Sequence, residues 1–304
     1  MLKFFIAIGL LISSLNVLAE VPLKVQKVTE NVYAIIGELV QRSPENYANN
    51  ATFGLVVTPK GAVLIDSGGS YLGAQQLHKA IQTVTDQPVK IVINAGGQDH
   101  RWLGNGYFKE KGARIISSKA ALEDQTKRAD DQFFMLNLLL KDKLKGTKKV
   151  YADETFEDSM TLDFGGEKFT LVHAGAAHTK GDIFIWMPST KVMFSGDIVF
   201  TDRLLGPGPA ADTASWLKVF EKMVSYKPDT IVPGHGTPST IKKATAETYD
   251  YIAYMRKEVG KVLDNDGDMQ DAVKIDQSKF SYLKVFDQMS GRAAQSFFSE
   301  MEFE

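Results

Sequence analysis

Two strand-rich stretches, each followed by helical patterns, constrain the fold of this chain more than any other feature. The expected strands are short, apolar runs rich in β-branched residues: 23–28, 32–36, 52–58, 62–65, 89–93, 115–116, 169–173, 183–186, 192–194 and 230–232. Apolar residues at helical spacing predict helices at about 71–84, 118–144, 213–223 and 239–262, and in a tail over 276–304. Two sheets that each need an apolar face covered pack most simply against each other, with helices on both outer faces. We therefore predict an α+β fold built on two stacked sheets.

The composition supports a large folded core and excludes several function classes. Of the 304 residues, 44% are hydrophobic and 24% charged, which is typical of a globular chain rather than a disordered one. The net charge of −2 offers no general attraction for nucleic acid. With no cysteine in the chain, disulfides, thiolate metal sites and cysteine nucleophiles are excluded. Any metal must be held by histidine, carboxylate, amide or water.

The first nineteen residues have the pattern of a secretory signal peptide. Lys3 precedes an apolar stretch at 4–12, and Val17-Leu18-Ala19 provides a small-residue cleavage site before Glu20. The apolar stretch is short for a bilayer span, so a retained anchor is the second choice. We predict a signal peptide at 1–19, a single mature domain at 20–304, a periplasmic or secreted location, and no stable membrane insertion after cleavage.

Histidine and aspartate side chains follow several of the predicted strands, usually beside glycine. His100, His178 and His235 occupy such positions, and Asp197 follows the strand at 192–194. Loops at strand ends are where rigid scaffolds present reactive side chains. Imidazoles and carboxylates brought together from distant loops are what a zinc or iron site requires. The pattern predicts one metal site assembled by folding.

Five motifs in order resemble the metallo-β-lactamase superfamily of hydrolases, and they cover nearly the whole mature chain. The motifs are Leu64-Ile65-Asp66-Ser67-Gly68, the stretch from Asn94 to Asn105, Ala177-His178-Thr179-Lys180-Gly181-Asp182, Phe194-Ser195-Gly196-Asp197 and Val232-Pro233-Gly234-His235-Gly236. The resemblance implies a four-layer αββα sandwich with a metal cleft along one edge of the sheets. The residues after the last motif then form a C-terminal helical tail.

The stretch from Asn94 to Asn105 departs from the family pattern Asn-Thr-His-x-His-x-Asp-His-x-Gly-Gly-Asn, and two registers are open. Without a gap, the two histidines of the first metal site become Gly96 and Gln98, the aspartate becomes His100 and the last histidine becomes Arg101. With one inserted residue, Asp99-His100 match the family's Asp-His. We prefer the second register, because a guanidinium has no lone pair to offer a cation.

Either register removes two ligands of the first site, so the resemblance implies one ion per chain, zinc or iron, in the second site. Its expected ligands are Asp99, His100, Asp197 and His235. The expected catalytic residues are Asp99, Asp197 and His178, the last of which would orient a water or move a proton. Asp66 would not bind the metal itself but would orient one of the metal-binding side chains.

The function that follows is hydrolysis of an ester, thioester, lactone or amide, with a small-molecule substrate contacted by Gln98, Arg101 and Trp102. The alternative is a metal-free pseudoenzyme or periplasmic binding module. In that case Arg101 neutralises Asp197 and binds an anionic ligand through its guanidinium. The apolar cluster at 133–140 is expected to form a buried helix face, and a homodimer is left open.

Overall fold

The strands form two β-sheets in this computed structural model, which describes residues 21–304; the predicted signal peptide lies outside the described residues. The first sheet has the order β1-β2-β3-β4-β5-β6-β7, antiparallel up to β4 and parallel from there on. Its strands are β1 (Lys24–Thr29), β2 (Val32–Ile36), β3 (Thr52–Thr58), β4 (Gly61–Ile65), β5 (Val89–Ile93), β6 (Arg114–Ser118) and β7 (Glu154–Phe156).

The second sheet has the order β12-β11-β10-β9-β8, and only β11 and β12 pair in parallel. Its strands are β8 (Ser159–Phe164), β9 (Glu167–Val172), β10 (Phe184–Met187), β11 (Val192–Phe194) and β12 (Thr230–Val232). The two sheets meet near one edge, where the Thr52 amide donates to the Gly234 carbonyl at 2.8 Å.

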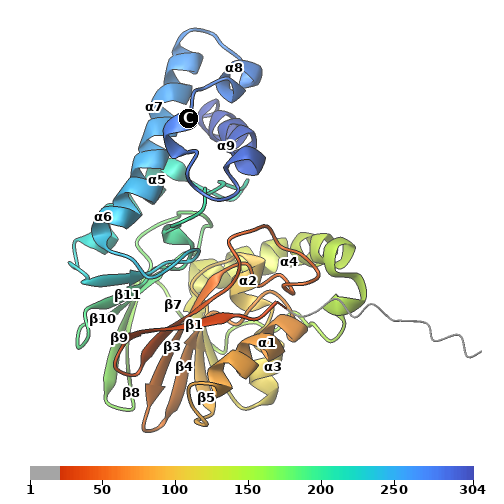
Figure 1. The fold of residues 1–304 in the computed structure, drawn as a ribbon, viewed down its shortest axis with the longest axis vertical. Coiled ribbons are helices and arrows are strands. Elements are labelled where there is room, and N and C mark those ends of the chain that lie inside the picture. Colours follow the sequence, from red (N-terminus) through yellow and green to blue (C-terminus); the bar gives the residue numbers. More distant parts are fainter. Residues whose placement is uncertain (1–20) are drawn as a thin grey trace, which may run out of the picture.

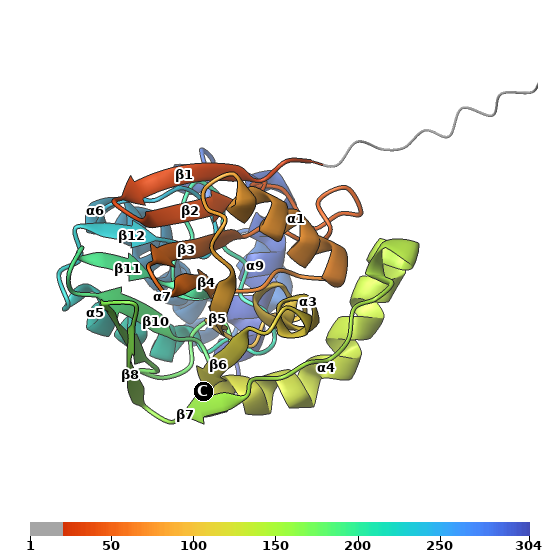
Figure 2. The ribbon, with the colours of Figure 1, turned by 90° about the horizontal axis from the view of Figure 1, so that it is seen from below.

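Helices cover both outer faces of this sandwich (Figures 1 and 2). The α-helices are α1 (Tyr71–Gln82), α2 (Asp99–Trp102), α3 (Asn105–Glu110), α4 (Lys119–Leu140), α5 (Thr213–Val224), α6 (Ile241–Ala244), α7 (Asp250–Asp264), α8 (Met269–Val273) and α9 (Phe286–Met301). Short 3-10 turns lie at η1 (Lys141–Leu144), η2 (Gly196–Ile198) and η4 (Ser278–Phe280), and η3 (Thr245–Tyr249) is a π-helical turn between α6 and α7.

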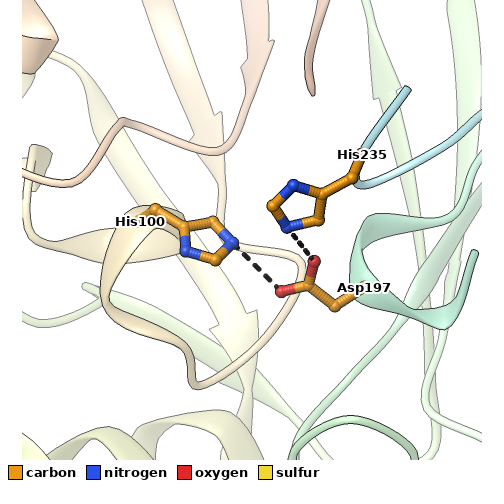
Figure 3. A group of neighbouring side chains, drawn as sticks. All are labelled: His100, Asp197 and His235. Carbon is orange, nitrogen blue, oxygen red and sulfur yellow. Dashed lines mark ion pairs between the residues drawn. The ribbon is translucent and has the colours of Figure 1, made fainter. Parts of the chain in front are cut away.

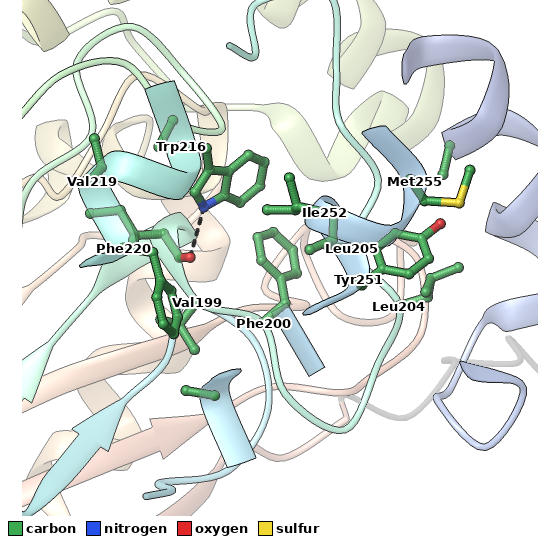
Figure 4. Packing of buried hydrophobic residues seen from close by; sticks show 14 of the residues in the cluster. Val199, Phe200, Leu204, Leu205, Trp216, Val219, Phe220, Tyr251, Ile252 and Met255 are labelled. Carbon is green, nitrogen blue, oxygen red and sulfur yellow. Dashed lines mark hydrogen bonds between the residues drawn. The ribbon is translucent and has the colours of Figure 1, made fainter. Parts of the chain in front are cut away.

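Three apolar layers hold the sandwich together. One fills the space between the sheets, with Ile93 and Phe194 among its members. A second lies under α1 and α3 on the outer face of the first sheet. The third joins the second sheet to α5, α7 and α9. Figure 4 shows its centre, where Trp216 of α5 donates from its indole nitrogen to the Ile198 carbonyl at 2.8 Å. Burial of large apolar side chains on both faces of each sheet is the main source of stability here.

The predicted αββα arrangement and C-terminal helices are confirmed, with differences in detail. Strands β7 and β8 were not predicted, because their many polar residues obscure the alternation of apolar and polar side chains that indicates a strand. The helix predicted at 239–262 is interrupted by η3, whose Thr248 hydroxyl bonds both the amide and the carbonyl of Phe200.

Helix α4 does not bury the whole apolar cluster at 133–140. Leu136 and Leu140 face the core, but Phe134, Met135 and Leu138 are 61%, 63% and 56% exposed. Within residues 21–304, no helix is long and apolar enough to cross a membrane.

Candidate metal centre

The candidate site lies where four strands from the two sheets end. Asp66 follows β4 and His100 lies in α2, just after β5. Asp197 lies in η2 after β11, and His235 follows β12. Within each sheet the two strands concerned are parallel neighbours, so their carboxyl ends lie at the same edge. The fold therefore delivers these side chains to one place from positions far apart in the sequence.

Three of these side chains form a group that could hold a metal ion: His100, Asp197 and His235 (Figure 3). One ligand atom from each lies within 4.8 Å of the others, and all three residues are buried. The Nε2 atom of His100 is 3.2 Å from Asp197 Oδ2, and Nε2 of His235 is 3.2 Å from Asp197 Oδ1. Both rings thus direct the same nitrogen at the same carboxylate.

The hydrogen bonds behind His100 fix the tautomer of its ring. Its Nδ1 atom is 3.2 Å from Asp99 Oδ1, which also accepts the His100 backbone amide at 2.8 Å. An ionised carboxylate only accepts, so Nδ1 carries a proton, and in the neutral ring Nε2 is then left with a lone pair. This Nε2 is buried and makes no hydrogen bond. A lone pair that faces a carboxylate is stabilised only if a cation or proton lies between them.

His235 has the same arrangement from the opposite side. Its Nδ1 atom lies 2.8 Å from the backbone carbonyl of Asn50, which also only accepts. The proton therefore lies on Nδ1, and the Nε2 lone pair points at Asp197. Burial holds the pKa of His235 well below its usual range, so the ring is neutral. Two neutral imidazoles and one carboxylate are a donor set found in both zinc and iron(II) sites.

Arg101 lies beneath this group and is fully used by protein acceptors. Its Nε donates to Asp197 Oδ2 at 3.0 Å and its Nη2 to Asp197 Oδ1 at 2.6 Å. The remaining N–H groups donate to Asp66 Oδ2 at 2.8 Å and to the carbonyls of Thr52 and Gly234. A guanidinium has five N–H donors, and all five are occupied. The side chain is 0% exposed.

The two carboxylates that contact Arg101 respond differently to their surroundings. Burial raises the pKa of Asp66 to about 6, although Arg101 and the Ala95 amide oppose the rise. Burial would also raise the pKa of Asp197, but the Arg101 guanidinium outweighs it and holds that pKa well below its usual range. Asp197 is therefore ionised at neutral pH and accepts the Arg101 fork on one side of its carboxylate while facing the imidazoles.

The structure brings together three of the four predicted metal ligands and leaves out Asp99. The Asp99 carboxylate forms an ion pair with Arg42 and contacts His100 Nδ1, so it lies behind the ring of His100 rather than beside its Nε2. Since His100 alone of the pair faces Asp197, this is the arrangement that the ungapped register predicts. The gapped register, which we preferred, expected both side chains to face the metal.

Of the three residues predicted to contact a substrate, one lines a cavity at the site and two are buried in the protein. Gln98 lines a cavity of about 290 Å³ together with His100, His178 and His235. Trp102 is fully buried against Tyr151, and its indole nitrogen donates to Gln132 Oε1 at 3.0 Å. Arg101 has no donor left for a ligand. The structure therefore does not support Arg101 or Trp102 as substrate contacts, nor an anion site built on Arg101.

His178 lines the same cavity but lies outside the group of three. Its ring contacts Phe200 and Trp216, and its Nδ1 atom is buried without a hydrogen-bond partner. Burial lowers the pKa of His178 to about 4, so the ring is neutral at pH 7. It can accept or donate a hydrogen bond there, according to its tautomer.

Carboxyl groups from other segments closely approach Gly96 and Gly97. A Cβ atom on Gly96 would overlap Oδ1 of Asp182. The Asp182 carboxyl is held by the amide and hydroxyl of Thr179, at 2.7 and 2.5 Å. Similarly, a Cβ atom on Gly97 would overlap Asp124 Oδ2. Glycine is therefore required at both positions because the two carboxyl groups leave no room for a Cβ atom, and not only because the backbone turns here.

Sequence reasoning missed three arginines at the cavity, Arg42, Arg128 and Arg203. Arg42 comes from the loop between β2 and β3 and pairs with Asp99. Arg203 follows η2 and is only 4% exposed. None of the three lies in a recognisable motif, although the close spacing of Arg203 to Asp197 is a signal that could have pointed to it.

Comparison with known proteins agrees with this fold. Residues 47–235 match the metallo-beta-lactamase superfamily. A metallo-beta-lactamase type 2 from Elizabethkingia meningoseptica is 28% identical over 200 residues, which cover 65% of this chain and 72% of that protein. A linear primary-alkylsulfatase from a Pseudomonas species is 20% identical over 241 residues, covering 67% of this chain and 46% of that protein.

Solved structures are similar as well. A metallo-beta-lactamase from Pontibacter korlensis superposes with a TM-score of 0.61 at 22% identity, covering 76% of this chain and 99% of that one. The family match spans more than half of the sequence and contains His100, Asp197 and His235. The chain belongs to the metallo-β-lactamase superfamily of hydrolases.

Proposed function

We propose that this protein is a metal-dependent hydrolase with one zinc or iron ion held by His100, Asp197 and His235. The observation that carries the proposal is the pair of imidazole Nε2 atoms, each 3.2 Å from an oxygen of Asp197. Both Nδ1 atoms are committed to oxygen acceptors, so in neutral rings both Nε2 lone pairs are free to bind a cation beside Asp197. A metal bound there would polarise an oxygen of the substrate and lower the pKa of a coordinated water.

The protein's own side chains orient this group. Asp99, which is held by Arg42, accepts from His100 Nδ1 and fixes the tautomer that presents Nε2. The Asn50 carbonyl does the same for His235. Arg101 fixes the carboxylate plane of Asp197 through its fork. We therefore propose Asp99 as a positioning residue and not as a ligand.

His178 is proposed to act on the attacking water or the leaving group. It is a neutral ring beside the group of three, in the same cavity of about 290 Å³. A positioned histidine without a protein partner can hold a water or pass a proton through its ring nitrogens. The bond cleaved is proposed to be an ester, thioester, lactone or amide, with a sulfate ester as a further candidate because a relative is an alkylsulfatase.

Elemental analysis of the untagged, dialysed protein tests the proposal. We expect about one equivalent of zinc or iron per chain. His100→Ala and His235→Ala should lose the metal, whereas Asp99→Ala should only weaken metal affinity by about 10- to 100-fold. His78→Ala is the matched control, because His78 bonds Tyr107 outside the site. Wild-type protein that holds no metal above background, even after incubation with zinc or iron(II), would refute the proposal.

We also propose that the protein acts in the periplasm or outside the cell. The pattern of the first nineteen residues supports this location.

A further inference from the structure

Arg203 is a buried cation that forms no direct ion pair among residues 21–304, although Asp197 is near enough to attract it. Its side chain is only 4% exposed, and its Nη1 donates to the Val40 carbonyl at 3.2 Å. Its Nε atom is buried and makes no hydrogen bond. Buried charges are normally paired, so an unpaired guanidinium calls for a partner that the chain does not supply.

His235 does not provide that partner. Nη1 of Arg203 lies 3.5 Å from His235 Nδ1, but this nitrogen already donates to Asn50. Two donors cannot bond each other. Arg203 therefore lies beside a proposed metal ligand with most of its N–H groups unused.

Arg203 lines the cavity of about 290 Å³ at the metal centre, together with Arg42 and Arg128. Arg42 is paired with Asp99, and Arg128 with Asp124. Arg203 takes part in neither pair, so its guanidinium can donate to an anionic group that enters the cavity.

A second cavity of about 480 Å³ adjoins the first and has an apolar wall. The two cavities share Arg42, Gln98 and Arg128 among their lining residues. The outer cavity is also lined by Met135 and Leu139 of α4. Met135 is 63% exposed although its side chain is apolar. A pocket lined by arginines thus continues into one with an apolar wall.

We propose that Arg203 binds the anionic group of the substrate, and that the apolar part of the same molecule lies against Met135 and Leu139. The substrate class is then an amphiphilic anion. This inference rests on the proposed function for its catalytic meaning, because the same cavity is lined by two of the proposed metal ligands, His100 and His235.

Binding of octane-1-sulfonate, measured by calorimetry below its micelle concentration, tests the inference. The probe has an anionic head, an apolar chain and no bond for a hydrolase to cleave. We expect Arg203→Gln to weaken binding by about tenfold or more, and Arg203→Lys to restore part of it. Arg114→Gln should bind as the wild type does, because Arg114 pairs with Glu154 at the surface.

Two comparisons separate the contribution of the probe's anionic head group from that of its alkyl chain. Methanesulfonate should bind about tenfold or more weakly than octane-1-sulfonate, since it buries little apolar surface. Met135→Asn should reduce this difference, whereas Leu138→Asn should not, because Leu138 is exposed on α4 and lines neither cavity.

The inference is overturned if Arg203→Gln binds octane-1-sulfonate as tightly as the wild type. It is equally overturned if octyltrimethylammonium binds as well as the sulfonate, which would indicate a general apolar docking surface. Metal content measured on the same samples keeps the two proposals apart. Metal without sulfonate binding refutes this inference alone, and sulfonate binding without metal refutes the proposed function alone.

Discussion

Arg101 and Asp197 form a two-bond contact, with Nε–Oδ2 at 3.0 Å and Nη2–Oδ1 at 2.6 Å, in the interior of the protein. The same guanidinium also holds Asp66. Three separate loops are therefore joined through one side chain. In a metal-free binding module, the Arg101 guanidinium would bind the ligand. In this structure it bonds Asp197 and Asp66 instead and holds the site together.

Replacing Arg101 should destabilise the fold strongly. Arg101→Gln leaves Asp66 and Asp197 buried without their cation, and we expect a loss of about 3–5 kcal/mol in the free energy of unfolding. Urea denaturation in the presence of a chelator measures this loss. The control Arg114→Gln removes an exposed ion pair and should cost about 1 kcal/mol or less. Equal losses in the two variants would contradict the assigned role.

Asp182 should make the stability depend on pH. Burial, with Asp197 nearby, raises the pKa of Asp182 from 3.8 to about 8, so the folded state keeps a proton that the unfolded state releases. The resulting stability is complete below about pH 4 and is lost as the pH rises towards about 8.

Asp182→Asn removes this dependence, because the amide stays neutral at every pH. We expect the stability difference between wild type and variant to change by about 1.4 kcal/mol per pH unit between about pH 5 and 7. Denaturation curves at several pH values measure it. A difference that stays constant across this range would show that Asp182 is ionised in the folded state.

Gly96 should not tolerate even a methyl group. The new Cβ would overlap Asp182, so Gly96→Ala is expected to destabilise the protein by about 1–3 kcal/mol. Adding Asp182→Ala should relieve the overlap, which gives a coupling energy in a double-mutant cycle. Gly106→Ala is the control, because its Cβ would meet Val150 at an ordinary 3.5 Å. Additive effects of the two changes would count against the overlap.

Metal should stabilise the folded state. Excess zinc at about 100 times its dissociation constant is expected to add about 2.7 kcal/mol, since the assembled ligand group exists only in the folded chain. Thermal denaturation with zinc and with chelator measures the shift. His235→Ala should show the same transition in both conditions, and a shift of wild-type size in that variant would place the metal elsewhere.

Export should remove the first nineteen residues. Protein recovered from the periplasm of a bacterial host is expected to begin at Glu20, as measured by intact mass. A mass that includes Met1 would support a retained segment.

The sandwich could be predicted because its motifs sit at strand ends that local patterns already indicate. His100, Asp197 and His235 were found in this way. That all five N–H groups of Arg101 are bonded could not be predicted, since the five acceptor atoms come from four separate segments whose approach depends on how the sheets stack.

The exclusion of Asp99 from the group of three has a similar origin. It depends on Arg42, in a loop without any motif, and adjacent residues of a short helix point in different directions. The interruption of the helix at 239–262 was equally hidden, because η3 forms around contacts of Thr248 with a distant loop.

The Asp182 carboxyl occupies the space beside Gly96 and so limits which side chains position 96 can carry. In the ungapped register Gly96 stands where relatives carry a histidine, but restoring that histidine alone would place it on top of Asp182. A histidine at position 96 therefore needs at least two changes together, and the first of them alone carries a cost. A single substitution does not supply the ligand that the family pattern has at this position.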